Sequence, residues 1–335
     1  MNLLKRIERM KPTILSVSLF AFLLTACSMS ETKKDQQIDS RIKNEIHILN
    51  KQIVDGLVAN KIEKILPICN HQLRNRKREI KRLMELVKGT IKTSDFRILN
   101  EYYLKNAAKK GIATLSSNKG NIHDYQIRYK STNKEMYVVV AYFEDSLYQK
   151  SFTFFYGRQN NKWQLTNLQA GGLKIMRKDA IDWYLQAKSE YQKGYLIDAM
   201  CHIGLANQIV SPVNHMWKYQ KEKEIQLFQQ KITKETYSKY HFPHTVDYVQ
   251  TKPVIFRIYA QVMPEGCLPL VLYTTTINLK NVHPLADECK AMHEKIGQLF
   301  KGIDTNNKII VYRPLKNSPT GTETDNKYVF MMSNK

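Results

Sequence analysis

The feature that most constrains this chain is a short apolar run near its start. Ile14 to Leu24 carry no charge. A helix that crosses a bilayer needs about 20 apolar residues, so this run is too short to span a membrane and fits the apolar core of a signal peptide. Four basic residues precede it, as such a segment requires: Lys5, Arg6, Arg9 and Lys11. No later run is both long and uncharged enough to cross a bilayer, so the rest of the chain is predicted to be globular.

The apolar run ends in Leu24-Thr25-Ala26-Cys27, which resembles the lipobox of bacterial lipoproteins. The resemblance implies a signal peptide of residues 1–26 and a mature chain that begins at Cys27, acylated and joined to diacylglycerol. Two or more acyl chains anchor a protein stably. Because Ser28 rather than an aspartate follows, the resemblance favours an outer-membrane anchor facing the periplasm, or the outer face of the plasma membrane in a host with one membrane. The alternatives are an ordinary secretory signal and an N-terminal membrane anchor.

The chain is strongly basic, with a formal net charge of +22 over 335 residues. A field of that sign attracts anionic surfaces and polymers. An exported protein rarely meets nucleic acid, so nucleic acid is not an expected partner. Anionic lipid head groups, glycans or an acidic envelope protein are expected instead. The alternative is a lysine-rich surface that is only solvated.

Residues 27–37 are polar and are predicted to form a tether. From Ile38 to Leu57 apolar residues recur every three or four positions, which predicts an amphipathic helix, and Glu79–Val87 is a further helical stretch. The densest group of basic residues lies just before and within this second stretch, and we call it the 74–82 cluster. We predict that it binds an anionic lipid or glycan surface; the alternative is a solvated helix edge. Its members are Arg74, Arg76, Lys77, Arg78, Lys81 and Arg82.

From Phe96 onward, short strand-like runs alternate with turn residues, which predicts hairpins and an antiparallel sheet. Helices followed by a meander of strands indicate the α+β class. Because nearly every residue of Met136–Phe143 is apolar, both faces of the sheet are expected to be covered. The predicted strands are Phe96–Leu104, Ile112–Ser116, Asp124–Tyr129, Met136–Phe143, Ser151–Tyr156 and Trp163–Leu168.

Residues 38–172 resemble the nuclear-transport-factor-2-like superfamily, chiefly in the segment Asn160-Asn161-Lys162-Trp163-Gln164-Leu165. The resemblance implies a cone-like domain of helices packed on a curved antiparallel sheet, with a pocket between them. Some members are enzymes that use a pocket Asp or His. His123 and Asp124 are neighbours at a predicted strand start, where successive side chains point to opposite faces. They are not expected to cooperate, and no catalytic residue is predicted.

Residues 175–235 resemble a single tetratricopeptide repeat, a hairpin of two antiparallel helices. Gly194 lies at the predicted turn, and Asn214–Lys234 is predicted to continue as a third helix. Small residues occupy the positions where two such helices touch: Ala187, Ala199 and Ala206.

A single repeat cannot bury its own apolar face, so this one must pack on a neighbouring domain or on a partner. Docking of an envelope protein would use four aromatic residues; the alternative is a helical bridge packed within the chain. These residues are Trp183, Tyr184, Tyr191 and Trp217.

Residues 253–335 are predicted to form a small α+β unit with the order ββαββ. Its elements are expected at Val254–Val262, Leu270–Leu279, Pro284–Phe300, Lys308–Arg313 and Tyr328–Met332.

Besides Cys27 the chain has four cysteines, Cys69, Cys201, Cys267 and Cys289, which allow three pairings. Cys267–Cys289 is the first candidate for a disulfide because both lie in the C-terminal unit; the alternative is buried free thiols.

Two groups of residues have side chains of the kinds that bind metal ions: His241 with His244, and Cys289 with His293 and Asp287. A structural zinc site needs four ligands. Neither group supplies them, so no metal or cofactor is predicted.

The features together predict a non-catalytic, lipid-anchored envelope protein that binds or scaffolds. A carrier of a small apolar or anionic ligand in the N-terminal pocket is the alternative, and an envelope enzyme is a third. A polar pocket in the N-terminal domain would favour the carrier, whereas an exposed apolar groove near Trp183 and Trp217 would favour docking.

Overall fold

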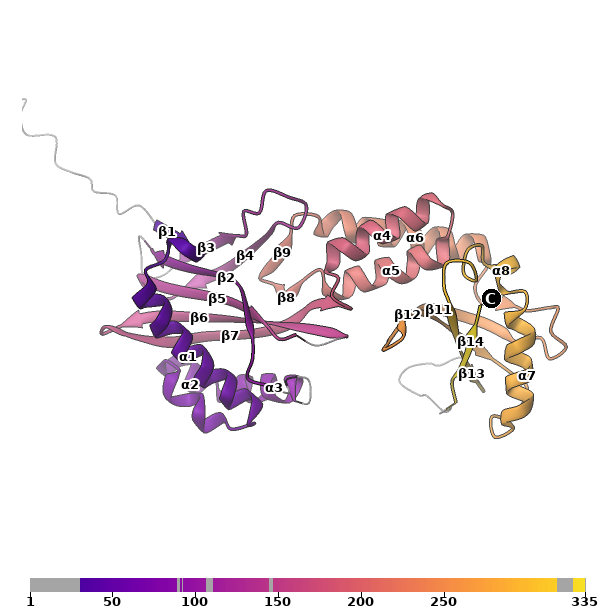
Figure 1. Cartoon of the computed structure of the whole chain (residues 1–335), viewed down its shortest axis with the longest axis horizontal. Helices are drawn as coiled ribbons and strands as arrows, with labels where there is room; N and C mark the ends of the chain where they lie inside the picture. The colour runs from indigo at the N-terminus through magenta and orange to yellow at the C-terminus, as the bar shows by residue number, and fades with distance from the viewer. Residues whose placement is uncertain are drawn as a thin grey trace, which may run out of the picture.

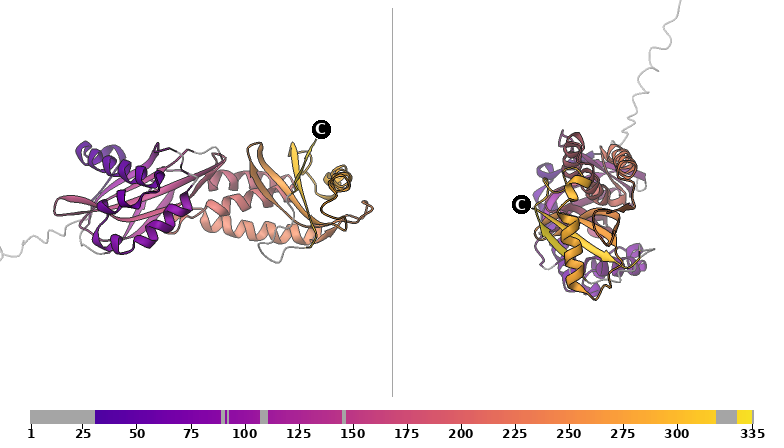
Figure 2. Two further views of the ribbon diagram at one scale, coloured as in Figure 1. Left: turned by 90° about the horizontal axis from the view of Figure 1, so that it is seen from below. Right: turned by 90° about the vertical axis from the view of Figure 1, so that its right-hand side faces the viewer.

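The computed structural model describes residues 31–88, 91, 93–106, 111–144, 147–317 and 328–334. The molecule is elongated: an N-terminal part, a helical segment and a C-terminal sheet follow one another along its long axis (Figures 1 and 2). Helices and mainly antiparallel sheets occur together, so the predicted α+β class is confirmed. Cys27 and the signal segment lie outside the described residues. Within the described ranges, no helix combines the length and apolar character that crossing a bilayer demands.

The main N-terminal sheet is fully antiparallel, with strand order β1-β2-β5-β6-β7. The predicted strands in this region are confirmed, although the last two are longer than expected. The strands are β1 (Glu31–Lys34), β2 (Arg97–Lys105), β5 (Glu135–Tyr142), β6 (Tyr148–Gln159) and β7 (Lys162–Ile175).

Three helices lie on one face of this sheet: α1 (Ser40–Val58), α2 (His71–Asn75) and α3 (Lys77–Val87) (Figure 1). Asp39 begins α1 by accepting a hydrogen bond from the backbone nitrogen of Arg41 at 2.9 Å. On β5, Tyr137 and Val139 pack toward the helices, whereas Val138 and Val140 pack toward the opposite layer. The expectation that both faces are covered is therefore confirmed.

The prediction of a tether over residues 27–37 is wrong for its second half. Glu31–Lys34 forms β1, which pairs with the end of β2, and Asp35–Gln37 forms a short 3-10 helix. Polar composition indicated a loop, but an edge strand also tolerates polar residues on its exposed side.

The strands β3 (Gly111–Ser116) and β4 (Tyr125–Ser131) do not join the main sheet as expected. They form a second sheet with β9 (Trp217–Tyr219), which comes from the segment predicted as the third helix. Trp217 and Tyr219 are buried and Lys218 between them is exposed, a period of two that suits a strand. The predicted helix therefore begins only after β9, as α6 (Glu222–Tyr240).

The helices α4 (Ala180–Gln192) and α5 (Leu196–Ile209) form the expected hairpin, and Gly194 at the turn has a φ of 77°. The hairpin does not start a separate core. Most of its buried apolar residues share one apolar cluster with the small sheet and with one face of the main sheet. Leu196, Ile197 and Cys201 belong instead to the cluster of the C-terminal unit. A short strand, β8 (Pro212–His215), lies so close to β7 that a Cβ on Gly171 would stand 1.3 Å from the carbonyl oxygen of Pro212. This contact explains the glycine at that position.

The C-terminal sheet has the strand order β10-β11-β12-β13-β14. Helix α7 (Val282–His293), followed by the single turn α8 (Ile296–Leu299), connects β12 to the parallel strand β13. Most of the connection from β13 to β14 lies outside the described residues. The strands are β10 (His244–Thr245), β11 (Val254–Met263), β12 (Gly266–Thr274), β13 (Ile309–Leu315) and β14 (Phe330–Ser333).

Candidate functional site

An open groove of about 1130 Å³ lies in the N-terminal domain. One wall is the small sheet of β3, β4 and β9. The other wall comes from α2 and from the hairpin of β6 and β7. We call this feature the basic groove, because its charged lining residues are Arg76, Arg128, Lys130 and Lys218.

The alternation of β4 places its basic residues on the exposed side. Tyr125, Ile127 and Tyr129 are buried, whereas Arg128 and Lys130 are exposed. The strand pairing then adds neighbours from the adjacent strands: Thr114 lies opposite Arg128, Ile112 opposite Lys130, and Lys218 opposite Gln126. Successive residues of a strand point to opposite faces, so one face of the small sheet carries the cations and the other packs into the core.

The charge of the groove has one sign. Its described lining residues include four cations and no carboxylate. Among the described residues, Arg128, Lys130 and Lys218 form no salt bridge, while Arg76 pairs with Glu79 at 3.0 Å. Unpaired cations lining a concave surface concentrate the field on whatever enters it. The groove is therefore suited to an anionic ligand.

The buried side of the groove is polar as well as aromatic. The ring of Tyr129 packs against that of Phe155 with centroids 5.2 Å apart. Burial raises the pKa of Tyr129, so its hydroxyl stays protonated, and that hydroxyl has no hydrogen-bond partner among the described residues. Thr166 donates to the carbonyl oxygen of Phe155 at 3.0 Å.

All members of the 74–82 cluster are exposed, but they lie in different places and make different contacts. Arg74 folds back on the preceding turn, where its Nε donates to the carbonyl oxygen of Cys69 at 2.9 Å. Arg76 lines the basic groove. The remaining members, Lys77, Arg78, Lys81 and Arg82, lie on the exposed side of α3, whose other side buries Ile80 and Met84. Of the predicted cluster, only Arg76 is brought to the groove.

The four aromatic residues predicted to dock a partner are not an exposed surface. Trp183, Tyr184 and Trp217 are 3%, 2% and 0% exposed, respectively, and belong to the shared apolar cluster. Tyr191 is half-buried and donates to Glu235 at 3.1 Å. The prediction of a docking surface at these residues is therefore wrong. The alternative is what the structure shows: the hairpin buries its apolar face against the chain itself.

The predicted disulfide is also not formed. All four described cysteines are free, and Cys267 and Cys289 lie in different apolar clusters. Cys289 is in van der Waals and hydrogen-bonding range of the Tyr273 hydroxyl, with Sγ and Oη 3.1 Å apart. Burial raises the pKa of Cys267 and of Cys289 to about 12, so both remain thiols. Proximity along the sequence suggested this pair, but Cys289 contacts β12 at Tyr273, near the opposite end of that strand from Cys267.

His123 and Asp124 diverge as expected. Nδ1 of His123 lies 2.8 Å from Asp179, whereas Asp124 accepts hydrogen bonds from Ser117 and from the backbone nitrogen of Lys119. His123, Asp179 and Asp182 stand close enough together to suggest a cation site. The two carboxylates, however, already cap α4 through backbone nitrogens of its first turn. These hydrogen bonds explain the cluster.

The other predicted ligand groups do not converge. His244 donates from Nδ1 to the carbonyl oxygen of Tyr240 at 3.0 Å, and His241 ends α6 in a left-handed conformation. Nδ1 of His293 lies 3.1 Å from the Tyr312 hydroxyl. His244 and His293 therefore each have a structural contact of their own.

A buried polar network that the sequence did not reveal joins the helical hairpin to the C-terminal unit. Glu190, Asp198 and His202 are all at most 5% exposed, and Glu190 lies 2.6 Å from His202. Asp198 accepts hydrogen bonds from Asn306 at 3.1 Å and from Asn307 at 2.7 Å. Because the groups come from α4, α5 and a distant loop, no spacing in the sequence could have indicated them. Because these groups are buried and hydrogen-bonded to one another or to the asparagine amides, we assign them to stability.

This network predicts a pH dependence of stability. Burial raises the pKa of Asp198 to about 6, although the two asparagine amides oppose the shift. Between about pH 4 and pH 6 the folded state binds the extra proton, so this group's contribution to the free energy of unfolding falls as pH rises through that window. At about 1.36 kcal/mol per pKa unit, the loss is roughly 2–3 kcal/mol. Asp198→Asn should remove that loss.

Urea unfolding at several pH values between 4.5 and 7.5 measures this effect. The difference between the wild-type chain and the Asp198→Asn variant should change with pH, since other titrating groups are common to both. Exposed Asp287→Asn is the control and should change the pH profile little. A constant difference between wild type and Asp198→Asn across the range would contradict the assignment.

No protein-family model, curated protein or solved structure matches this chain.

Proposed function

We propose that this chain is a non-catalytic, lipid-anchored protein of the bacterial cell envelope whose N-terminal domain binds an anionic, phosphate-bearing ligand in the basic groove. The observation that carries the proposal is the single sign of charge in a hollow of about 1130 Å³. Cys27 supplies the anchor by its resemblance to the lipobox cysteine. The resemblance to nuclear-transport-factor-2-like domains adds the expectation of a ligand pocket in this domain.

Ligand binding is a better interpretation than docking of a protein through the repeat-like hairpin. Trp183 and Tyr184 of that hairpin are buried in the core. By contrast, the groove cations Arg128, Lys130 and Lys218 are exposed and form no salt bridge with any described residue. Protein interfaces bury apolar and aromatic centres, while phosphate-bearing ligands are recognised by cationic side chains. The groove offers cationic side chains.

The groove residues do not suggest a reaction. General acid–base chemistry needs a titratable group that is positioned by a second one. His71 lines the groove, and its Nδ1 lies 3.5 Å from the Asn75 amide, one helical turn away on an exposed surface. That amide does not titrate. We therefore assign the groove to binding.

Neutralising the groove tests this proposal. We expect Arg128→Gln, Lys130→Gln and Lys218→Gln together to weaken binding of a fluorescent soluble polyphosphate to the non-lipidated mature chain. An exposed ion pair contributes about 0.2–1 kcal/mol, so three should cost roughly 3- to 150-fold in the dissociation constant at low ionic strength. Fluorescence anisotropy measures the change, and added salt should reduce it.

The control carries the same change in net charge elsewhere: Lys234→Gln, Lys290→Gln and Lys308→Gln, all at exposed positions. It should bind polyphosphate nearly as the wild-type chain does. If both triple variants lose affinity equally, binding reflects net charge alone and the groove is not the site. If neither loses affinity, the proposal is contradicted directly.

A further inference from the structure

Only a few residues separate the proposed anchor at Cys27 from the folded domain. β1 begins at Glu31, four residues after Cys27. An extended chain advances at most about 3.6 Å per residue, so Glu31 lies within roughly 15 Å of the lipidated cysteine. The first strand of the main sheet is thus held next to the membrane surface.

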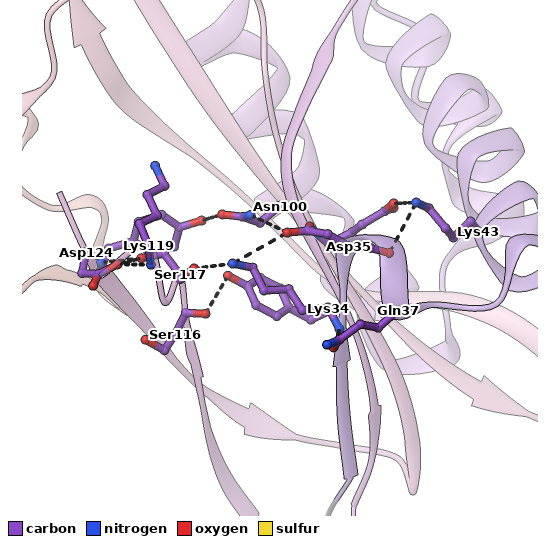
Figure 3. Close-up of polar contacts among 12 residues, drawn as sticks. Lys34, Asp35, Gln37, Lys43, Asn100, Ser116, Ser117, Lys119 and Asp124 are labelled. Carbon is purple, nitrogen blue, oxygen red and sulfur yellow. Dashed lines mark hydrogen bonds and ion pairs between the residues drawn. The ribbon is translucent and has the colours of Figure 1, made fainter. Parts of the chain in front are cut away.

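The residues that follow β1 are fixed to the domain by side-chain contacts (Figure 3). Asp35 accepts hydrogen bonds from the Asn100 amide and from the backbone nitrogen of Glu101, both at 2.9 Å. Lys34 donates from Nζ to the carbonyl oxygen of Ser117. Asp35 has a φ of 48°, a left-handed conformation that side chains other than glycine rarely adopt, so these contacts hold it in place. The segment is part of the domain and cannot lengthen the anchor.

The strand pairing places Asn133, at one end of the basic groove, at the same end of the main sheet as the start of β1. Glu31 lies opposite Lys105, which lies opposite Glu135 on the next strand. Asn133, which lines the groove, donates from Nδ2 to the carbonyl oxygen of Arg158 at 3.2 Å on the strand beyond. Neighbouring strands are about 4.8 Å apart, so this end of the groove lies roughly 15 Å from the start of β1.

We infer that the basic groove faces the leaflet that holds the acyl chains, and that its ligand is the phosphate-bearing head group of lipids in that leaflet. The inference rests on the proposed function and names the ligand of that same site. Two further exposed lysines, Lys134 and Lys162, lie at this end of the domain and complement an anionic surface. Each basic residue near such a surface adds about 1 kcal/mol of attraction.

Fluorescence quenching in proteoliposomes tests the orientation. The lipidated chain is reconstituted into vesicles of phosphatidylethanolamine and phosphatidylglycerol that contain a head-group nitroxide lipid. A fluorophore is attached at Lys162→Cys, beside the groove end, or at Lys280→Cys in the C-terminal unit, both in a Cys267→Ser background because the other described thiols are buried. We expect quenching at residue 162 to be several-fold greater than at residue 280. Equal quenching, or more at residue 280, would overturn the orientation.

A second arm distinguishes lipid from soluble phosphate as the ligand. Twenty Gly/Ser residues inserted between Ser30 and Glu31 free the domain from its short anchor. Quenching at residue 162 should then persist only when phosphatidylglycerol is present. It should fall several-fold in the groove triple variant (Arg128→Gln, Lys130→Gln and Lys218→Gln). It should not fall in the control triple variant (Lys234→Gln, Lys290→Gln and Lys308→Gln). If the groove triple variant loses polyphosphate binding in solution yet does not change quenching here, the groove binds a soluble anion. That result would overturn the lipid inference and leave the proposed function standing.

Discussion

Replacing Trp217 by alanine is expected to lower the free energy of unfolding by about 3–5 kcal/mol. Trp217 is fully buried, and its ring stacks on that of Tyr125 with centroids 4.1 Å apart. It also fixes β9 against β4 through the pair with Ile127. The substitution removes the largest side chain at the junction of the small sheet and the helices, so the cavity it leaves cannot close by small movements.

Urea unfolding followed by circular dichroism measures the loss. Leu227→Ala is the matched control, because Leu227 is 54% exposed and its truncation should change stability by no more than about 0.5 kcal/mol. The Trp217→Ala variant should also bind polyphosphate less well, since Lys218 loses its support. A variant as stable as Leu227→Ala would show that β9 is not part of the core.

The second large effect concerns the anchor. A chain with Cys27→Ala and a cleavable secretory signal in place of residues 1–26 should move from the membrane fraction to the soluble fraction after washing at about 1 M salt. At that ionic strength the Debye length is about 3 Å, so attraction of the basic groove to lipid is screened. Acyl chains bind through the hydrophobic effect and are not released by salt.

Cell fractionation and immunoblotting measure the distribution. The wild-type chain should stay in the membrane fraction under the same wash, and its metabolic labelling with palmitate should depend on Cys27. If the Cys27→Ala chain remains membrane-bound after the salt wash, a lipid at this cysteine is not what holds the protein.

Much of the secondary structure was predictable because it depends on local periodicity. The stripe from Ile38 to Leu57 became α1, and the uniformly apolar run at 136–143 became a strand covered on both sides. The errors came from pairings between distant segments. The helix predicted over Asn214–Lys234 includes β9, because three residues are too few to indicate a strand by themselves and only the pairing with β4 makes this segment one.

The basic groove was not predicted, although part of its signal is present in the sequence. The run Gln126-Ile127-Arg128-Tyr129-Lys130 alternates polar and apolar residues, which indicates a strand with one basic face. The prediction favoured the 74–82 cluster because charge density along the chain is easier to see than charge on one face of a sheet. Lys218 lies 90 residues after Arg128 in the sequence and reaches that face only because β9 pairs with β4. No local pattern could show this pairing.

The most direct test of the groove is hydrogen–deuterium exchange of the non-lipidated mature chain with and without soluble polyphosphate, read by mass spectrometry. If the basic groove is the site, exchange should slow in the peptides that contain β3, β4 and β9, and the groove triple variant should lose this protection. Helix α7 should exchange at the same rate with and without polyphosphate. Protection confined to α3, or spread evenly over the chain, would contradict binding in the groove.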